Sequence, residues 1–263
     1  MGDAGRAGSH LRFFVAEDAV GAWREAEEIF DTSVWRLRRG KGRHFVLGTA
    51  FEPAQPYWVA GFDIELKHFD IARLTPYQDI PVEQVVEAAL RVLPRMVLMH
   101  RLLAPPTGML VHAAGGVVAG RTHLFLGQSG AGKSTLSRLL LTHGGVEVVN
   151  DDRMLLTHGG GPDEWTAWGT PWPGELRIAH DRHAPLGALL FLDKSDRNTL
   201  EPLAPLDALE RLIPLVSIPW YEVELVANAL ELCNRLVTEV PTYALRFRPD
   251  RGAVDAVAAL ASK

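Results

Sequence analysis

A glycine-rich octapeptide limits what this chain can fold into more than any other feature. Residues Gly127 to Ser134 read Gly-Gln-Ser-Gly-Ala-Gly-Lys-Ser and fill the pattern G-x-x-x-x-G-K-[ST], directly after the apolar run Leu124 to Leu126. In such a loop the backbone N–H groups wrap a polyphosphate, and the following helix presents its N-terminus to the negative charge. The pattern therefore predicts a strand, a phosphate-binding loop and a helix, in that order.

Each position of the octapeptide has an expected role. Lys133 should reach the β- and γ-phosphates, and the Ser134 hydroxyl should ligate magnesium, so the expected cofactors are ATP and Mg²⁺. The helix should end at Gly144-Gly145, where glycine is the usual terminator. The alternative is a glycine-rich turn without a ligand. The expected nucleotide-binding residues are Gly127, Gln128, Ser129, Gly130, Ala131, Gly132, Lys133, Ser134 and Thr135.

Composition excludes several other classes of protein. The chain has 263 residues of which 47% are hydrophobic, which is enough for one large packed domain or two modest ones. The net charge of -5 and the lack of a long basic run argue against nucleic-acid binding, and we interpret the short basic cluster at 36–43 as solvated surface. The single cysteine, Cys233, leaves no internal disulfide and suits a reducing cytoplasm. The first ten residues lack the apolar core of a secretory signal, and no stretch is apolar enough to span a membrane, so we expect a cytoplasmic protein.

The pattern of apolar residues changes at Pro105-Pro106-Thr107-Gly108, which we take as the domain boundary. Residues 1–104 are expected to form a small α+β region with a linking helix, and residues 105–263 an α/β domain. In the first region we expect a helix over 20–30, strands over 44–51 and 58–66, and a helix over 82–104 that is interrupted at Pro94. In the second we expect strands over 109–114, 117–118, 123–126, 146–149, 154–156, 165–168, 187–192 and 243–247, and helices after 135 and over 205–216, 221–240 and 254–260.

Two adjacent carboxylates, Asp151 and Asp152, follow the short strand after the loop's helix. Magnesium prefers oxygen ligands, and an attacking hydroxyl must lose its proton, so phosphoryl transfer needs carboxylates near the phosphates. We expect this strand to neighbour the strand before the loop, so that both end at the same edge of the sheet. The alternative is a polar turn with two solvated aspartates.

Further candidates come from residue type alone. His112 precedes the loop by one hairpin, and its alternative is a structural histidine in a strand. Glu175 and Arg177 follow a turn and could meet the substrate or the transferred phosphoryl group, or could simply be exposed. Weaker candidates are Arg153 and Arg197 for charge, and Trp165, Trp168 and Trp172 for a pocket that holds adenine or a peptide.

Taken together, residues 108–200 resemble the catalytic domain of the HPr kinase/phosphorylase family and its serine-kinase-like relatives. The features that carry the resemblance are His112, the loop Gly127 to Thr135, and the run Val148-Val-Asn-Asp-Asp152 at a compact distance after one helix. The resemblance implies a P-loop domain of the HPr kinase type, with His112 as the active-site histidine and Lys133 and Ser134 as phosphate and magnesium contacts. It also implies that one of Asp151 and Asp152 is the general base and the other is associated with metal. We assign Asp151 as the base and Asp152 to the metal, with the exchange of the two left open.

The chain departs from the family pattern in two places. Ala113 replaces the glycine that usually follows the histidine, and the Met-Arg-Gly signature that accompanies phosphorylase activity is absent. The segments Gly169 to Glu175 and Val240 to Asp250 look instead like those of divergent kinase-like relatives. The resemblance thus implies an ATP- and magnesium-dependent kinase that phosphorylates a hydroxyl, most simply a serine, of a peptide, protein or small molecule, without efficient phosphate-dependent reversal. The rival is a nucleotide-binding regulatory or assembly module with little or no phosphotransfer, and the acceptor and any homo-oligomeric state stay open.

Overall fold

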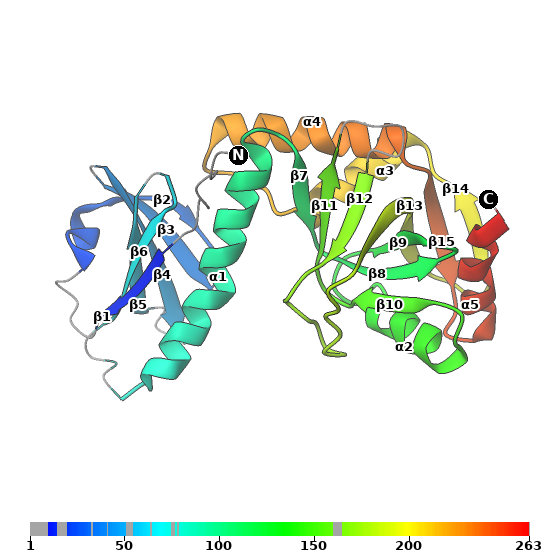
Figure 1. Cartoon of the computed structure of the whole chain (residues 1–263), viewed down its shortest axis with the longest axis horizontal. Helices are drawn as coiled ribbons and strands as arrows, with labels where there is room; N and C mark the ends of the chain where they lie inside the picture. The colour runs from blue at the N-terminus through cyan, green and yellow to red at the C-terminus, as the bar shows by residue number, and fades with distance from the viewer. Residues whose placement is uncertain are drawn as a thin grey trace, which may run out of the picture. The chain divides into compact units, whose positions relative to one another are not determined.

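The computed structural model describes residues 10–14, 20–32, 34–40, 42–50, 55–63, 65–74, 77, 79–159 and 165–262. It is a mixed α/β structure that divides into two compact units, Met1–Leu98 and Met99–Lys263 (Figure 1). The division falls inside helix α1 (Val82–Leu103), whereas the sequence places the boundary after Ala104. Among the helices that the structure describes, none combines the length and the hydropathy needed to cross a membrane.

The first unit is built on a six-stranded sheet in the order β1-β6-β5-β4-β3-β2. β1 runs parallel to β6, and the other neighbours are antiparallel. A buried cluster around Trp23, Phe45 and Leu47 covers one face of the sheet. The strands are β1 (His10–Phe14), β2 (Glu27–Asp31), β3 (Trp35–Gly40), β4 (Arg43–Ala50), β5 (Gln55–Phe62) and β6 (His68–Arg73).

The helix predicted over 20–30 is wrong. This segment holds a short 3-10 turn, η2 (Trp23–Glu25), and then enters β2. Gly21 has a φ of +91°, which interrupts a helix, and the Phe30 and Trp35 rings pack across the β2–β3 pair at 5.4 Å. Cross-strand pairing has therefore outweighed a local helical spacing. The strands β1, β3 and β6 were not predicted, and residues 51 and 64 of the two predicted strands lie outside the described residues.

Helix α1 runs without a break through Pro94, so the predicted interruption is also wrong. Proline lacks an N–H group and removes one hydrogen bond to the preceding turn, which normally disfavours a helix interior. Here Val85, Ala89, Leu93 and Met96 recur at helical spacing and are all buried. Burial of this apolar stripe outweighs the missing hydrogen bond.

The second unit is a branched nine-stranded sheet whose central element is the long strand β13 (His183–Lys194). The second half of β13 pairs in parallel with β9 and β15, and its first half pairs with β12. One branch has the order β10-β8-β9-β13-β15-β14, and the other has the order β13-β12-β11-β7. The remaining strands are β7 (Gly108–Val111), β8 (Ala113–Val118), β9 (Arg121–Leu126), β10 (Glu147–Asn150), β11 (Met154–His158), β12 (Trp165–Gly169), β14 (Thr199–Pro202) and β15 (Thr242–Phe247).

Helices cover both faces of this sheet, as Figure 1 shows for α2 and α5 on one side and α3 and α4 on the other. Alternate residues of the central strands enter the two cores: Leu190 and Leu192 pack with α2 and α5, whereas Leu189 and Phe191 pack with α4. This double burial explains the near-continuous apolar run of β13. The helices are α2 (Lys133–His143), α3 (Pro205–Leu212), α4 (Val223–Glu239) and α5 (Arg251–Ala258), with 3-10 turns η3 (Ile213–Leu215) and η4 (Ala259–Ser262).

Two expectations for this unit are wrong, and both bear on the site. The strand predicted over 109–114 is divided at His112, because Val111 pairs with β11 while Ala113 pairs with β9. β10 is not a neighbour of β9, because β8 lies between them. Both β9 and β10 are antiparallel to β8, however, so they run in the same direction and end at the same edge. The other predicted elements are confirmed with end positions that differ by a few residues, and β14 was not predicted.

Candidate functional site

The glycine-rich loop joins β9 to α2 at the carboxyl edge of the central sheet. Gly130 and Gly132 have φ angles of +81° and +110°, a region that side chains disfavour. A Cβ atom on Gly132 would lie 2.7 Å from Cζ of Phe247, so the end of β15 packs directly against the loop. No side chain in the described part of the chain caps the N-terminus of α2, which leaves its first N–H groups available to an anion.

Lys133 lies in the mouth of this loop and is only 8% exposed. Its Nζ atom donates to the carbonyl oxygens of Gly127 at 2.5 Å and Gln128 at 3.3 Å. Burial lowers the pKa of Lys133 from its ordinary value, and the nearby Asp152 carboxylate offsets part of that effect. The ammonium is thus held by neutral carbonyls, and anionic phosphate oxygens would be stronger partners.

Strand register explains why His112 and Asp152 meet beside the loop. Ala113 pairs with Leu126, so His112 stands level with the first residue of the loop, while the end of β10 pairs with Gly115 of the same strand. Nδ1 of His112 lies 3.2 Å from Oδ1 of Asp152. The contact is close but not aligned as a hydrogen bond, and Nδ1 makes none with any residue that the structure describes.

Asp152 presents a partly open carboxylate to this edge. Its side chain is 26% exposed, and Nε of Arg153 lies 3.4 Å from Oδ2. The backbone N–H of Asp152 donates to Oδ1 of the buried Asn150 at 2.8 Å, which fixes the turn after β10. The carboxylate therefore stands among three groups that can carry positive charge: His112, Arg153 and Lys133.

Asp151 has a different environment although it is the adjacent residue. It is 3% exposed, and its oxygens accept backbone hydrogen bonds from Gly174 at 2.8 Å, Leu176 at 2.6 Å and Ile178 at 3.1 Å. A carboxylate that is buried and already accepts three N–H donors is poorly placed to take a substrate proton. The geometry therefore departs from both versions of the assignment: Asp152 is the open carboxylate, and Asp151 anchors the segment 170–180.

This anchored segment carries two of the predicted substrate residues. Glu175 is largely exposed and pairs with Arg138 of α2 at 2.6 Å. Arg177 is exposed, has a φ of +57°, and makes no ion pair with another described residue. Asn150 supports the same segment by donating to the Thr170 carbonyl at 2.9 Å, a role that the sequence analysis missed. The signal available for Asn150 was an amide side chain directly after a buried strand, where such residues fix turns.

The weaker candidates divide between structural and exposed positions. Nε1 of Trp165 donates to Glu239 at 2.8 Å, and the Trp168 ring stacks on His183 at 4.3 Å, so both tryptophans have local structural partners. The backbone carbonyl of Trp172 lies within the anchored segment, 3.4 Å from Nδ2 of Asn150. Arg197 is exposed in the turn after β13.

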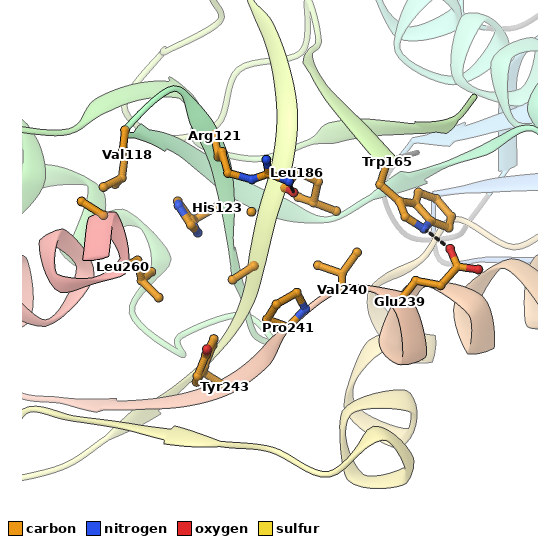
Figure 2. Close-up of a pocket in the computed structure, with 14 residues that line it drawn as sticks. Val118, Arg121, His123, Trp165, Leu186, Glu239, Val240, Pro241, Tyr243 and Leu260 are labelled. Carbon is orange, nitrogen blue, oxygen red and sulfur yellow. Dashed lines mark hydrogen bonds between the residues drawn. The ribbon is translucent and has the colours of Figure 1, made fainter. Parts of the chain in front are cut away.

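A pocket of 480 Å³ lies at the opposite, amino edge of the same strands (Figure 2). Arg121 and His123 face it from β9, Leu186 from β13, and Tyr243 from β15. His123 is 4% exposed, and burial, with a further contribution from Arg121, lowers its pKa to about 4. The pocket and the glycine-rich loop are separate sites, because they lie at opposite ends of β9.

A protein-only metal centre does not emerge from the described residues, since no three metal-ligating side chains gather in them. The donor set fits magnesium that arrives with a polyphosphate, because that ion keeps several waters and takes only one or two protein carboxylates. Ser134, in the first turn of α2, and Asp152 would supply one hydroxyl and one carboxylate.

Comparison with known proteins adds no assignment. No protein-family model matches this sequence, and no curated protein matches it at a significant level. The functional conclusion therefore depends on the geometry around Lys133, His112 and Asp152.

Proposed function

We propose that this chain is an ATP- and magnesium-dependent phosphotransferase with a P-loop domain of the HPr kinase type, which transfers a phosphoryl group to a hydroxyl. One observation carries the proposal: Asp152 and His112, 3.2 Å apart, stand beside the buried ammonium of Lys133 at the start of α2. A phosphate-binding loop holds the γ-phosphate, and an open carboxylate at its edge can accept the proton of an attacking alcohol.

Lys133 holds the transferred group. On nucleotide binding its Nζ atom exchanges the carbonyls of Gly127 and Gln128 for β- and γ-phosphate oxygens, and the uncapped N–H groups of α2 take the remaining charge. Because the lysine is already buried at the loop, little reorganisation is needed when the phosphate enters.

Asp152 is the general base in this proposal. The acceptor oxygen forms a bond to the γ-phosphorus, the bond from that phosphorus to the β–γ bridging oxygen breaks, and the hydroxyl proton passes to Oδ of Asp152. His112 orients this carboxylate through the contact at Oδ1 and is a positioning residue. Nε of Arg153 lies 3.4 Å from the other oxygen.

Asp151 acts through the backbone of the segment 170–180. Its hydrogen bonds to Gly174, Leu176 and Ile178 hold that segment beside α2, where Glu175 pairs with Arg138. The exposed guanidinium of Arg177 is then available to an acceptor or to the equatorial oxygens of the transferred group. Bound magnesium would neutralise charge on the phosphate oxygens, with the Ser134 hydroxyl as its protein contact. Asp152, which the sequence analysis assigns to the metal, is the base in this proposal.

The test is incubation with γ-labelled ATP and magnesium, with water, glycerol and a pool of serine-containing peptides as acceptors. We expect label to appear on a hydroxyl of one acceptor class, and Asp152→Asn to lower transfer by about 10²- to 10⁴-fold without loss of ATP binding. Asp181→Asn is the matched control, because Asp181 is an exposed aspartate of the same unit. Mass spectrometry of the product identifies the phosphorylated atom.

Two outcomes contradict the proposal. Tight ATP binding with no transfer to any acceptor would identify a nucleotide-binding regulatory module instead. Phosphorylation of a histidine or carboxylate would contradict the hydroxyl acceptor, because such groups do not need a base to remove a hydroxyl proton. Addition of inorganic phosphate to the phosphorylated product should yield little pyrophosphate, since the sequence lacks the signature tied to the reverse reaction in the family it resembles.

A further inference from the structure

The side of the loop on which the nucleoside must lie follows from the order of the strands. β8 and β10 lie on one side of β9 and deliver His112 and Asp152, whereas β13 and β15 lie on the other side. If the proposed function holds, the γ-phosphate faces Asp152. The triphosphate lies along the loop and the start of α2, so the nucleoside extends over the ends of β13 and β15.

These two strand ends are in contact with the loop. The ring of Phe247, the last residue of β15, would meet a Cβ on Gly132 at 2.7 Å, and the Leu192 Cβ lies 3.8 Å from the corresponding position on Gly127. The residues that follow each strand, 195–198 after β13 and 248–250 after β15, therefore stand immediately beyond the loop. We call these two turns the β13–β15 platform.

Hydrogen bonds join the two turns into one unit. Ser195 donates its N–H to the Phe247 carbonyl at 3.0 Å, and Arg248 donates its N–H to Oδ1 of Asn198 at 3.1 Å. Nδ2 of Asn198 donates to Oδ1 of Asp250 at 2.7 Å, and the same oxygen caps α5 by accepting from Gly252 at 2.9 Å. The platform is thus fixed by partners from both strands and from α5.

The platform carries two exposed arginines, Arg197 and Arg248, and of these two only Arg248 has its guanidinium held by a hydrogen bond to a described residue. Nε of Arg248 donates to Oδ2 of Asp250, yet the Arg248 side chain is 61% exposed. The carboxylate of Asp250 accepts from Arg248, Asn198 and Gly252, so it has little capacity left to read the edge of a base. A planar guanidinium that is held at one edge can stack on a flat ring.

We infer that Arg248 stacks on the base of the bound nucleotide and that the platform is its nucleoside subsite. Stacking uses the face of the ring, which adenine and guanine share, so the site should discriminate weakly between ATP and GTP. The phosphate loop supplies affinity for the triphosphate, and Arg248 supplies the additional affinity for the nucleoside.

The test separates the contribution of the nucleobase to affinity from that of the phosphates. Titration calorimetry with ATP, GTP and inorganic tripolyphosphate, each with magnesium, is carried out on the wild-type chain and on Arg248→Ala. We expect the variant to bind ATP and GTP about 2- to 30-fold more weakly, the range of a cation–π contact, with tripolyphosphate affinity changed less than about twofold. Arg248→Lys keeps the charge but loses the planar group, and should resemble the alanine variant.

Arg251→Ala is the matched control, because Arg251 is a neighbouring exposed arginine that pairs along α5 with Asp255. Equal loss of affinity for ATP and tripolyphosphate in Arg248→Ala would overturn the inference in favour of a general charge effect. Unchanged ATP affinity in folded Arg248→Ala and Arg248→Lys would also overturn it. A wild-type chain that binds none of the three ligands would overturn the proposed function, and this inference with it.

Discussion

The two edges of the central sheet in the second unit are built from the same strands but differ in their chemistry. At the carboxyl edge, Lys133, His112 and Asp152 converge as charged or chargeable groups around backbone N–H donors. At the amino edge, a pocket of 480 Å³ surrounds His123, whose low pKa keeps it uncharged at neutral pH. The pocket is therefore not the place where the glycine-rich loop, Lys133 and Asp152 converge.

The difference follows from strand direction. β9, β13 and β15 are parallel, so the turns that follow them meet at one edge, and the N-termini of α2 and α5 lie at that edge too. Helix N-termini carry unsatisfied N–H groups and a positive partial charge, which favours anions. The amino edge receives the opposite ends of these elements. In this unit, strand direction therefore indicates the candidate site better than pocket volume does.

The largest expected effect is at Asp152. If the carboxyl edge is catalytic, Asp152→Asn should lower turnover by about 10²- to 10⁴-fold, the usual contribution of a general base. ATP affinity and the melting temperature should change little, because the carboxylate is partly exposed. Steady-state kinetics at saturating magnesium, beside thermal unfolding, measures both. Wild-type turnover in this variant would remove the base from the proposed mechanism.

Asp151→Ala should lower the stability of the fold, whereas the change at Asp152 should lower turnover. Its removal leaves three backbone N–H groups of the segment 170–180 without their acceptor, and we expect a loss of roughly 2–4 kcal/mol in the free energy of unfolding. Urea unfolding measures the change. A variant with full stability but no turnover would restore Asp151 as the base.

Lys133→Ala should weaken nucleotide binding while the fold stays intact. A charge-assisted contact contributes roughly 1.5–3 kcal/mol, which corresponds to about a 10- to 150-fold loss in ATP affinity. Calorimetric titration of a variant with a normal circular dichroism spectrum decides the question. Lys67→Ala serves as a control, because Lys67 is an exposed lysine of the first unit. Unchanged ATP affinity in Lys133→Ala would show that the loop is not the nucleotide site.

The smallest expected effect concerns His123 at the amino edge, and it depends on pH. Its folded pKa of about 4 lies below the ordinary 6.5, so the unfolded chain binds the extra proton between these values and stability falls as pH falls through that window. Between pH 7 and pH 5 this residue should account for roughly 2 kcal/mol of lost stability. His123→Gln should flatten that part of the stability profile in urea unfolding.

The exposed His143, at the end of α2, provides the comparison for this measurement. His143→Gln should leave the pH profile of stability as it is in the wild-type chain. If His123→Gln keeps the wild-type slope between pH 7 and pH 5, the buried imidazole is not the source of the acid sensitivity. The low pKa of His123 would then be wrong.

Local sequence was sufficient for the loop and for most of the second unit. The octapeptide, the apolar run before it and the glycines after α2 act within a few residues, and the structure has the predicted strand, loop and helix at these positions. The same is true of β10 and the two aspartates, since an apolar run followed by polar residues marks the end of a strand.

The tertiary structure decided which strands pair and which distant groups hydrogen-bond. The apolar spacing over 20–30 is helical, yet this segment pairs with β3, because the sheet offers partners that an isolated helix lacks. The insertion of β8 between β9 and β10, and the break at His112, depend on partners far along the chain. The roles of Asp151 and Asp152 could not be separated from the sequence, because they differ only in which distant N–H groups surround them. The sequence determines which residues follow one another. The fold determines which of them are buried and which distant groups they bond, and this decides which carboxylate stays open to a substrate.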